Sequence, residues 1–542
     1  MNVKRFLIPV AAALCALFTG CKDNDSDKSL QGITMEASVR LKPDETKQLS
    51  VTFFPSEAAD KTLKWTSSKP EIATVSTDGL VTALNEGSAV ITATSTADAS
   101  IKATCDVTVS AETITDLAGE IQGTWEKGSN IYVSGQIRVP EGKTLTIEEG
   151  VTVIFSNSGV GESHTAIELI VDGKLYCKGT AAKPVTFTVS ESQRSNGNQW
   201  QKHWGGIVCG AKCPEAVFDH VIIEYTGNQC IAESPSVIDG YYTAGGDFTP
   251  AITTNNVNGN YVVQNSTIRF TGESDALYFM GGNAIIANNT FYSVGETGAE
   301  AINMKAGVKI DAAFNLIFSP NTNGFKLSSS GQNAERQQAL VRAYNNTVVN
   351  AGWRRTSIKG GSIFVEKNAL VSVFNNLMVN CKFMAKTPKW DTPDASNGAD
   401  NNSVIDYNFY ASGSQTSPFA QDSPDYLTAF LGYTAAEKDY WHAGKNNTPK
   451  IDEHSIVSAS AGDSATDPKF LNFAINSVPL EESVLAPSWD FHVQAASPVL
   501  SNAYSNFTGA YTPYFGASGL TIGGTNYKTP APAARFGAFG TN

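Results

Sequence analysis

A repeated asparagine turn is the sequence feature that most constrains the fold of this chain. Short apolar stretches recur around the asparagine, and the repeats follow one another at steps of 24, 26, 31, 30 and 32 residues. A period of this size predicts one coil of a parallel β-helix. Because amides stacked about 4.8 Å apart can hydrogen-bond along the axis, we expect a structural role for these residues. They are Asn265, Asn289, Asn315, Asn346, Asn376 and Asn408.

The segments that flank the repeats support the same fold. Residues 135–151 resemble the first coil of exported β-helix proteins, and residues 218–227 resemble a following coil. Residues 490–500 and 535–540 are similar to the ending of such surface proteins. The resemblance implies a right-handed parallel β-helix, a solenoid, over residues 121–542, in which stacked coils bury a continuous core. It implies no particular activity, because the fold hosts lyases, hydrolases, adhesins and inert stalks.

A second all-β domain precedes the solenoid. Residues 31–110 form short runs of alternating apolar and polar residues at the spacing of a β-sandwich. Residues 65–75 and 86–93 within them closely resemble the bacterial Ig-like group 2 family. In that family the domain is a spacer or an adhesive module without catalytic residues, which implies that Trp65 is a core residue. Residues 111–120 are expected to be a linker.

The N-terminus has the features of an export signal. Lys4 and Arg5 precede 13 residues without charge, and small residues then lead to Cys21. This pattern predicts a secretory signal over residues 1–20, too short for a membrane span. The sequence before Cys21 resembles the bacterial lipoprotein box, which implies lipid attachment at that thiol. An ordinary secreted protein with an unrelated cysteine is the alternative.

The residues after Cys21 are expected to form a tether. Residues 21–30 are polar and acidic, with nothing that could build a core. They resemble the acidic stretch that directs some lipoproteins to the outer cell surface, although a plain solvated spacer fits equally. We therefore expect an outer-membrane protein, anchored by lipid and exposed at the cell surface.

The charge balance limits the partners. The chain has 39 Lys and Arg against 52 Asp and Glu, a net charge of −13, and loss of Lys4 and Arg5 with the signal lowers it to −15. Nucleic acids and anionic headgroups need a basic face, so neither is expected to bind. A polysaccharide, or a host or matrix glycan, is compatible with this surface.

The cysteines after Cys21 are too few to build a disulfide scaffold. Cys209 and Cys213 are close enough to pair, and with His203 and His220 they form a loose array that could hold zinc. The spacing matches no familiar zinc module, so buried thiols or a local disulfide are favoured and no metal is predicted. No cofactor is expected; calcium is possible, as in pectate-lyase-like enzymes, but no motif supports it.

No catalytic residue can be assigned from the sequence. The chain lacks the common short catalytic motifs, the aspartate pair of polygalacturonase-like enzymes and a convincing Arg-x-Pro-x-x-Arg of pectate-lyase-like enzymes. Long excursions between strands are the places where binding residues gather on such a fold. Aromatic rings beside charged groups in these excursions suit sugar rings. The candidate ligand-binding residues are Tyr241, Tyr242, Asp247, Trp353, Arg354, Arg355 and Trp390.

Three functions fit these features. The first is a non-catalytic surface lipoprotein whose β-helix binds a glycan or a host or matrix surface, as adhesins do. The second is a polysaccharide lyase or glycoside hydrolase, and the third is a structural envelope component. An enzyme should bring carboxylates together with Arg or Lys in one groove. A binder should show a less polar trough lined by aromatic residues.

Overall fold

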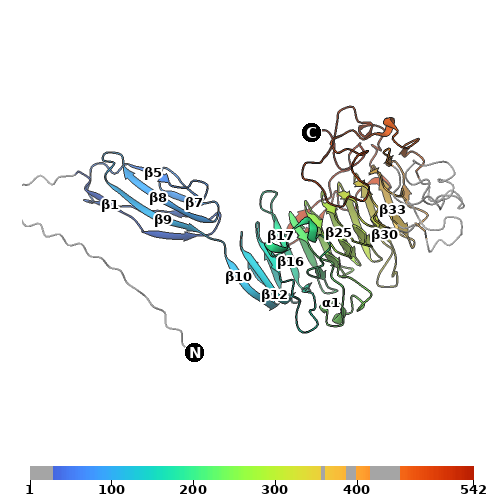
Figure 1. Cartoon of the computed structure of the whole chain (residues 1–542), viewed down its shortest axis with the longest axis horizontal. Coiled ribbons are helices and arrows are strands. Elements are labelled where there is room, and N and C mark those ends of the chain that lie inside the picture. Colours follow the sequence, from blue (N-terminus) through green and yellow to red (C-terminus); the bar gives the residue numbers. More distant parts are fainter. Residues whose placement is uncertain (1–28, 356–359, 386–397, 416–451) are drawn as a thin grey trace, which may run out of the picture. The chain divides into compact units, whose positions relative to one another are not determined.

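The computed structural model describes residues 29–355, 360–385, 398–415 and 452–542 (Figure 1). The chain divides into two compact units, Met1–Ser110 and Ala111–Asn542, and both are built almost entirely of strands. The predicted signal, Cys21 and most of the tether lie outside the described residues. Within those described ranges, no helix is long and apolar enough to cross a membrane.

The first unit is a small β-sandwich. One sheet has the order β2-β9-β8-β5 and another the order β3-β7-β6, and β1 pairs with β4. The strands are β1 (Gly32–Thr34), β2 (Ser38–Leu41), β3 (Thr46–Gln48), β4 (Thr52–Phe54), β5 (Leu63–Ser67), β6 (Ala73–Val75), β7 (Leu80–Ala83), β8 (Gly87–Ser95) and β9 (Lys102–Val109).

The core of the sandwich forms because alternate residues of each strand point inward. In β8 and β9, Ile91, Cys105 and Val107 are fully buried, while their neighbours face solvent. Trp65 packs against this core as expected. Gly79, at φ 87°, lies under the Trp65 ring, where an added Cβ would come within 2.6 Å of a ring carbon. A larger residue at that position would push Trp65 out of the core.

The second unit is a parallel β-helix. Its 10-stranded sheet contains β11 (Gly123–Trp125), β13 (Thr144–Ile147), β16 (Lys174–Lys178), β19 (Glu215–Asp219), β22 (Asn260–Gln264), β25 (Gly282–Ala287), β28 (Val308–Ala313), β31 (Leu340–Tyr344), β34 (Leu370–Phe374) and β36 (Val404–Ile405). Every pairing in this sheet is parallel and joins one coil to the next.

A 19-stranded sheet supplies the other two faces of the coils. One face contains β10 (Thr113–Glu120), β12 (Asn130–Val139), β14 (Thr152–Phe155), β17 (Val185–Val189), β20 (Val221–Glu224), β23 (Thr267–Arg269), β26 (Thr290–Tyr292), β29 (Leu316–Phe318), β32 (Thr347–Val349), β35 (Leu377–Val379), β37 (Phe409–Ala411) and β38 (Ile456–Val457). The other contains the end of β12, then β15 (Leu169–Val171), β18 (Ile207–Cys209), β21 (Ile252–Thr254), β24 (Leu277–Phe279), β27 (Ile302–Met304), β30 (Asn323–Ser328) and β33 (Gly361–Glu366).

The asparagine repeat is a ladder of stacked amides, as predicted. In Asn346, Oδ1 accepts from both the backbone N and Nδ2 of Asn315, at 3.0 and 2.9 Å, and Nδ2 donates to the Ala312 carbonyl. The same pattern joins Asn289 to Asn315, Asn346 to Asn376, and Asn376 to Asn408. From Asn289 to Asn408, each coil is therefore joined to the next by side-chain as well as backbone hydrogen bonds.

The prediction was wrong for one asparagine of the ladder. Asn265 is not part of it, because Ser266 occupies that position and its backbone N donates to Asn289. Asn265 instead takes the left-handed conformation, with φ 53°, as do the residues before the other ladder asparagines, including Phe314 and Tyr407. The left-handed turn and the amide stack thus belong to neighbouring residues.

Residues 111–120 belong to the solenoid and are not a free linker. Most of them form β10, which pairs in parallel with β12, and Ile114 and Leu117 pack against the solenoid core. Ile114 and Leu117 give this stretch a half-buried side, which a linker lacks. The first coil therefore begins before residue 121.

The C-terminal strap, residues 503–537, runs across the outside of the 10-stranded sheet. It contains a hairpin of β41 (Leu520–Ile522) and β42 (Thr525–Tyr527). The buried carboxylate of Asp311 accepts hydrogen bonds from the backbone N of Tyr514 and Phe515 and from the Thr529 hydroxyl. Before the strap, β39 (Phe470–Asn472) and β40 (Asp490–Val493) form an antiparallel pair.

Candidate functional site

The longest described excursion from the coils is residues 228–250, between β20 and β21. It contains α1 (Pro235–Ile238), the short helix beside the solenoid in Figure 1. The buried side chain of Glu168 binds both α1 and the C-terminal end of the excursion. One oxygen accepts from the Ser236 hydroxyl and from the Thr249 hydroxyl at 2.8 and 2.9 Å, and the other accepts from the Ser236 backbone N at 2.8 Å. The excursion is therefore held against the coil that contains β15.

Two further contacts hold the middle of the excursion. The Arg138 guanidinium pairs with Asp239 at 2.7 Å and also with Asp172 of the next coil. The hydroxyl of Tyr241 accepts from the Ala211 backbone N at 2.8 Å. Residue Tyr241, predicted as a ligand contact, thus also fastens the excursion to the coils.

A pocket of about 270 Å³ lies where the excursion meets the following two coils. Tyr241, Tyr242 and Asp247, three of the predicted binding residues, all line it. The opposite wall comes from the turns and strands of the next coils, and includes Asp275 and Glu300. The structure therefore brings these three predicted residues together, and adds carboxyl groups that were not predicted.

Asp275 and Glu300 occupy the same position on adjacent coils. Each stands two residues before one of the paired residues Leu277 and Ile302 of β24 and β27, so the two side chains stack along the axis. The backbone N of Glu300 donates to Oδ1 of Asp275 at 2.6 Å. Asn303 donates from Nδ2 to Oδ2 of Asp275 at 2.9 Å and to Glu300 at 3.5 Å. Two carboxyl groups therefore converge on one amide.

The surroundings of Asp275 favour its protonated form. Its side chain is buried, and burial together with the Glu300 carboxylate raises its pKa well above the ordinary value for aspartic acid. The hydrogen bonds from Glu300 N and Asn303 oppose this shift without cancelling it. Two carboxyl groups that share one amide donor do not ionise together easily, and this favours the protonated form of Asp275.

Other charged groups stand beside the pair. Glu273 accepts from the backbone N and hydroxyl of Thr297 at 3.0 and 2.8 Å, and lies 3.5 Å from the Lys202 ammonium. Lys305 lies over the ring of Tyr278, with Nζ 5.4 Å from its centre. Burial and the neighbouring Lys326 lower the pKa of Lys305.

The other predicted binding residues do not join this pocket. Trp353 is a buried core residue whose Nε1 donates to the Asn380 carbonyl. Arg354 and Arg355 are not an exposed basic pair, because Arg354 donates to the carbonyls of Val294, Gly295 and Ser319, and Arg355 to that of Thr297. Burial lowers the pKa of Arg354 to about 9. Trp390 lies outside the described residues.

The histidine and cysteine array does not assemble into a metal site. The described cysteines are buried free thiols, and the Cys213 thiol and burial together raise the pKa of Cys209 well above its ordinary value. His220 instead pairs with Asp219 at 2.9 Å, and the His203 ring packs near Tyr225.

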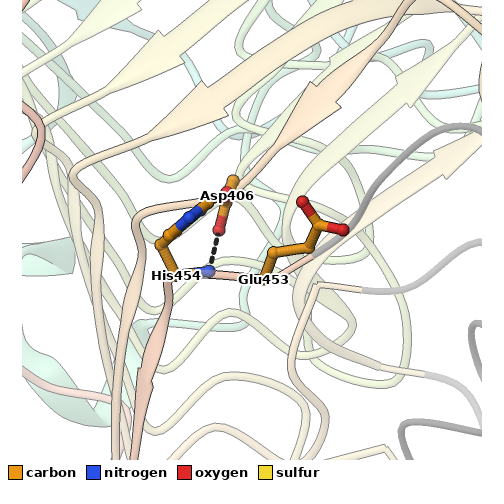
Figure 2. Close-up of side chains that lie close together, drawn as sticks. All are labelled: Asp406, Glu453 and His454. Carbon is orange, nitrogen blue, oxygen red and sulfur yellow. Dashed lines mark hydrogen bonds and ion pairs between the residues drawn. The ribbon is translucent and has the colours of Figure 1, made fainter.

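In the part of the chain that is described, the one group with metal-ligating geometry is Asp406, Glu453 and His454 (Figure 2). Nδ1 of His454 lies 2.6 Å from Oδ2 of Asp406, and the His454 backbone N donates to Oδ1 at 2.7 Å. The His454 ring stacks on Tyr407 at 4.7 Å. These contacts join two turns, which explains why Asp406 and His454 lie together. Glu453 and His454 are exposed.

Comparison with known proteins identifies the domains. Residues 31–107 match the bacterial Ig-like domain (group 2), and residues 117–229 match the pectate-lyase like beta helix domain. The chain therefore carries an Ig-like group 2 domain followed by a pectate-lyase-like β-helix, as the resemblances implied. The carboxyl pair lies beyond residue 229, so the β-helix match covers the fold and not this pair.

Two curated proteins share a short region with this chain. A 3-O-alpha-D-galactosyl-alpha-L-arabinofuranosidase of Bifidobacterium longum subsp. longum is 40% identical over 79 residues, which is 15% of this chain and 7% of that protein. An uncharacterised protein of Clostridium acetobutylicum is 38% identical over 74 residues, 14% of this chain and 19% of that protein. The chain thus spans a small part of each relative, about the length of one Ig-like domain.

Proposed function

We propose that this chain, an Ig-like domain followed by a pectate-lyase-like β-helix, acts on carbohydrate and hydrolyses a glycan at the Asp275–Glu300 pocket. The observation that carries the proposal is the pair of stacked carboxyl groups, in which the pKa of Asp275 is raised. Glycoside hydrolysis uses two carboxyl groups, one as a general acid with a raised pKa and the other as a carboxylate.

The composition of the pocket supports an enzyme over a pure binder. A trough that only binds sugar needs aromatic and amide groups, and gains nothing from buried acids. Here Asp247, Glu273, Asp275 and Glu300 all line one small pocket, beside Tyr241, Tyr242 and Tyr278. Placing the buried Asp275 among three half-buried acids costs free energy, which a catalytic role would justify.

The charge of the pocket favours a neutral glycan. Four of the lining residues are acidic, and neither Arg nor Lys is among the lining residues, all of which the structure describes. An acidic sugar would meet this excess of acidic groups, and a lyase would need a cation in the pocket wall to neutralise its substrate's carboxylate. Hydrolysis of an uncharged polysaccharide fits better than elimination from a polyuronate.

The chemistry follows from the protonation of the pair. Asp275 donates its proton to the glycosidic oxygen as the bond from that oxygen to the anomeric carbon breaks. The Glu300 carboxyl group stabilises the positive charge that develops on the sugar and accepts a proton from the attacking water. The products are two sugars with free hydroxyls, and the pair ends with one proton, as it began.

A panel of polysaccharides tests the proposal. Reducing-sugar release is measured with linear arabinan, β-1,4-galactan, xylan and mixed-linkage β-glucan, against polygalacturonate and alginate as acidic controls. We expect release from at least one neutral polymer, and loss of that release in Glu300→Gln but not in Glu120→Gln, an exposed acid on β10. Binding without release would support the adhesin-like function instead, and unsaturated products would support a lyase.

The membrane anchor is a separate proposal. The sequence before Cys21 supports lipid attachment there, and the acidic residues that follow support display at the cell surface. Metabolic labelling with a palmitate analogue should mark the wild-type chain and leave Cys21→Ser unlabelled. Labelling of both proteins would contradict attachment at Cys21, and protection of the wild-type chain from protease on intact cells would contradict surface display.

A further inference from the structure

One position of each coil forms a straight outer file along the solenoid. Strand register places one residue of β12, β15, β18, β21, β24, β27, β30 and β33 directly above the last. These residues are Arg138, Ile170, Val208, Thr253, Tyr278, Asn303, Lys326 and Phe364. Consecutive members lie about 4.8 Å apart, the spacing of strands in a sheet.

The exposure of the side chains in the file changes where the pocket lies. Ile170, Val208 and Thr253 point outward, because the residues on either side of each in its strand fill the core. All three are nevertheless buried, at 1%, 0% and 0% exposure. From Tyr278 onward the file includes half-exposed residues, among them Lys326 and Phe364. A cover outside the coils therefore lies over Ile170, Val208 and Thr253, whereas Tyr278 and Lys326 are half-exposed.

The excursion of residues 228–250 is that cover. It is fastened beside β15 through Glu168, beyond β18 through the Ala211 contact of Tyr241, and to the first coil through Arg138 and Asp239. The centre of the Tyr242 ring lies 6.5 Å from the centre of the Tyr278 ring, where the cover ends. The pocket is thus the closed end of the file, and its wall is pinned at several points.

The size of the pocket agrees with a closed end. A volume of about 270 Å³ is just below the range of roughly 300–1,000 Å³ that holds a drug-sized ligand. It suits one sugar ring, not several consecutive rings of a polymer. A chain could not continue past Tyr242 without displacing the excursion.

Building on the proposed function, we infer that the pocket takes the terminal residue of a neutral glycan chain, so that the enzyme releases sugars from a chain end. The rest of the chain leaves along the file past Asn303 toward Lys326. The excursion, and not the carboxyl pair, sets this specificity.

The test compares bond cleavage with viscosity. The member of the neutral panel with the fastest turnover is digested by the intact chain, and reducing ends, viscosity and product size are followed together. We expect the smallest sugar product from the earliest times, with viscosity almost unchanged. A rapid fall in viscosity with a spread of oligosaccharides would overturn the inference while leaving hydrolysis intact, whereas absence of all products would overturn the proposed function itself.

A variant of the wall gives an independent measurement. Tyr242→Ala should open the closed end, raise the viscosity loss per bond cut severalfold and weaken selection of the chain end by about tenfold, as loss of one well-packed group does. Tyr132→Ala, at a residue that is 44% exposed on the first coils, is the matched control and should behave as wild type. If Tyr242→Ala keeps both its fold by circular dichroism and the wild-type product pattern, the wall does not set the specificity.

Discussion

The backbone N of Glu300 donates to Oδ1 of Asp275 at 2.6 Å, and the two residues hold the same position on neighbouring coils. This contact links the repeat to the chemistry, because the stacking that builds the solenoid also places two acids side by side. Burial and the charge of Glu300 then raise the pKa of Asp275. The stacking of the coils and the raised pKa of Asp275 can be tested separately.

The raised pKa of Asp275 makes stability depend on pH in a definite direction. A group whose pKa is higher in the folded state stabilises the fold below its unfolded pKa, about 3.9 for aspartic acid. That stabilisation is lost as the pH rises through the folded pKa. Wild type should therefore lose urea resistance relative to Asp275→Asn as the pH is raised from 4 to 9.

Urea midpoints measured across this range for both proteins check the prediction. The asparagine amide keeps the shape of the side chain, and Asn303 has an unpartnered Oδ1 that can turn to accept from it. Glu120→Gln is the matched control and should follow wild type. A difference between wild type and Asp275→Asn that is constant over the whole range would argue against the raised pKa.

The amide ladder should carry much of the solenoid's stability. Asn346→Ala removes the acceptor for two donors of Asn315 and the donor to Asn376, all buried. Leaving a buried polar group without its partner costs about 1–3 kcal/mol, so we expect a loss of roughly 3 kcal/mol or more in the free energy of unfolding. Chemical denaturation, followed by the transition of the second unit, measures it.

Asn258→Ala is the control for the ladder, because Asn258 is exposed in a turn of the same solenoid. It should change the free energy of unfolding by less than about 0.5 kcal/mol. Equal losses in the two variants would mean that the stacked amides add nothing beyond ordinary surface asparagines.

The C-terminal strap should depend on Asp311. In Asp311→Ala the backbone N of Tyr514 and Phe515 and the Thr529 hydroxyl lose their common acceptor. We expect faster hydrogen exchange over the strap, residues 503–537, while the strands beneath stay protected. Thr521→Ala, at an exposed position of β41, should leave exchange unchanged. Unaltered exchange in Asp311→Ala would show that apolar packing alone holds the strap.

Much of the fold could be predicted from the sequence because it repeats. The asparagines recur at the coil period, and their amide ladder follows from stacking alone. The prediction of Asn265 failed because two neighbouring positions in each turn both favour asparagine, and only one of them stacks. Residues 111–120 were mistaken for a linker because a single first coil has no earlier repeat for comparison.

The site was harder to predict because it depends on contacts between coils. Asp275 and Glu300 are 25 residues apart and form no short motif, so they become partners only when the coils are aligned on their strands. Arg354 was predicted to bind a ligand because its carbonyl partners, Val294, Gly295 and Ser319, come from earlier coils and form no pattern with it in the sequence. Alignment of the repeats would have revealed the stacked acids, but not the burial of Arg354.

Binding and turnover by Asp275→Asn, measured on the same neutral polysaccharide, test the catalytic role of Asp275 most directly. Removal of a general acid lowers kcat by about 10²–10⁴-fold and leaves the ground-state contacts in place. We therefore predict that calorimetry gives a dissociation constant close to that of wild type while sugar release falls by this factor. Wild-type turnover in Asp275→Asn, or a polysaccharide that wild type binds and never cleaves, would contradict hydrolysis at the Asp275–Glu300 pocket.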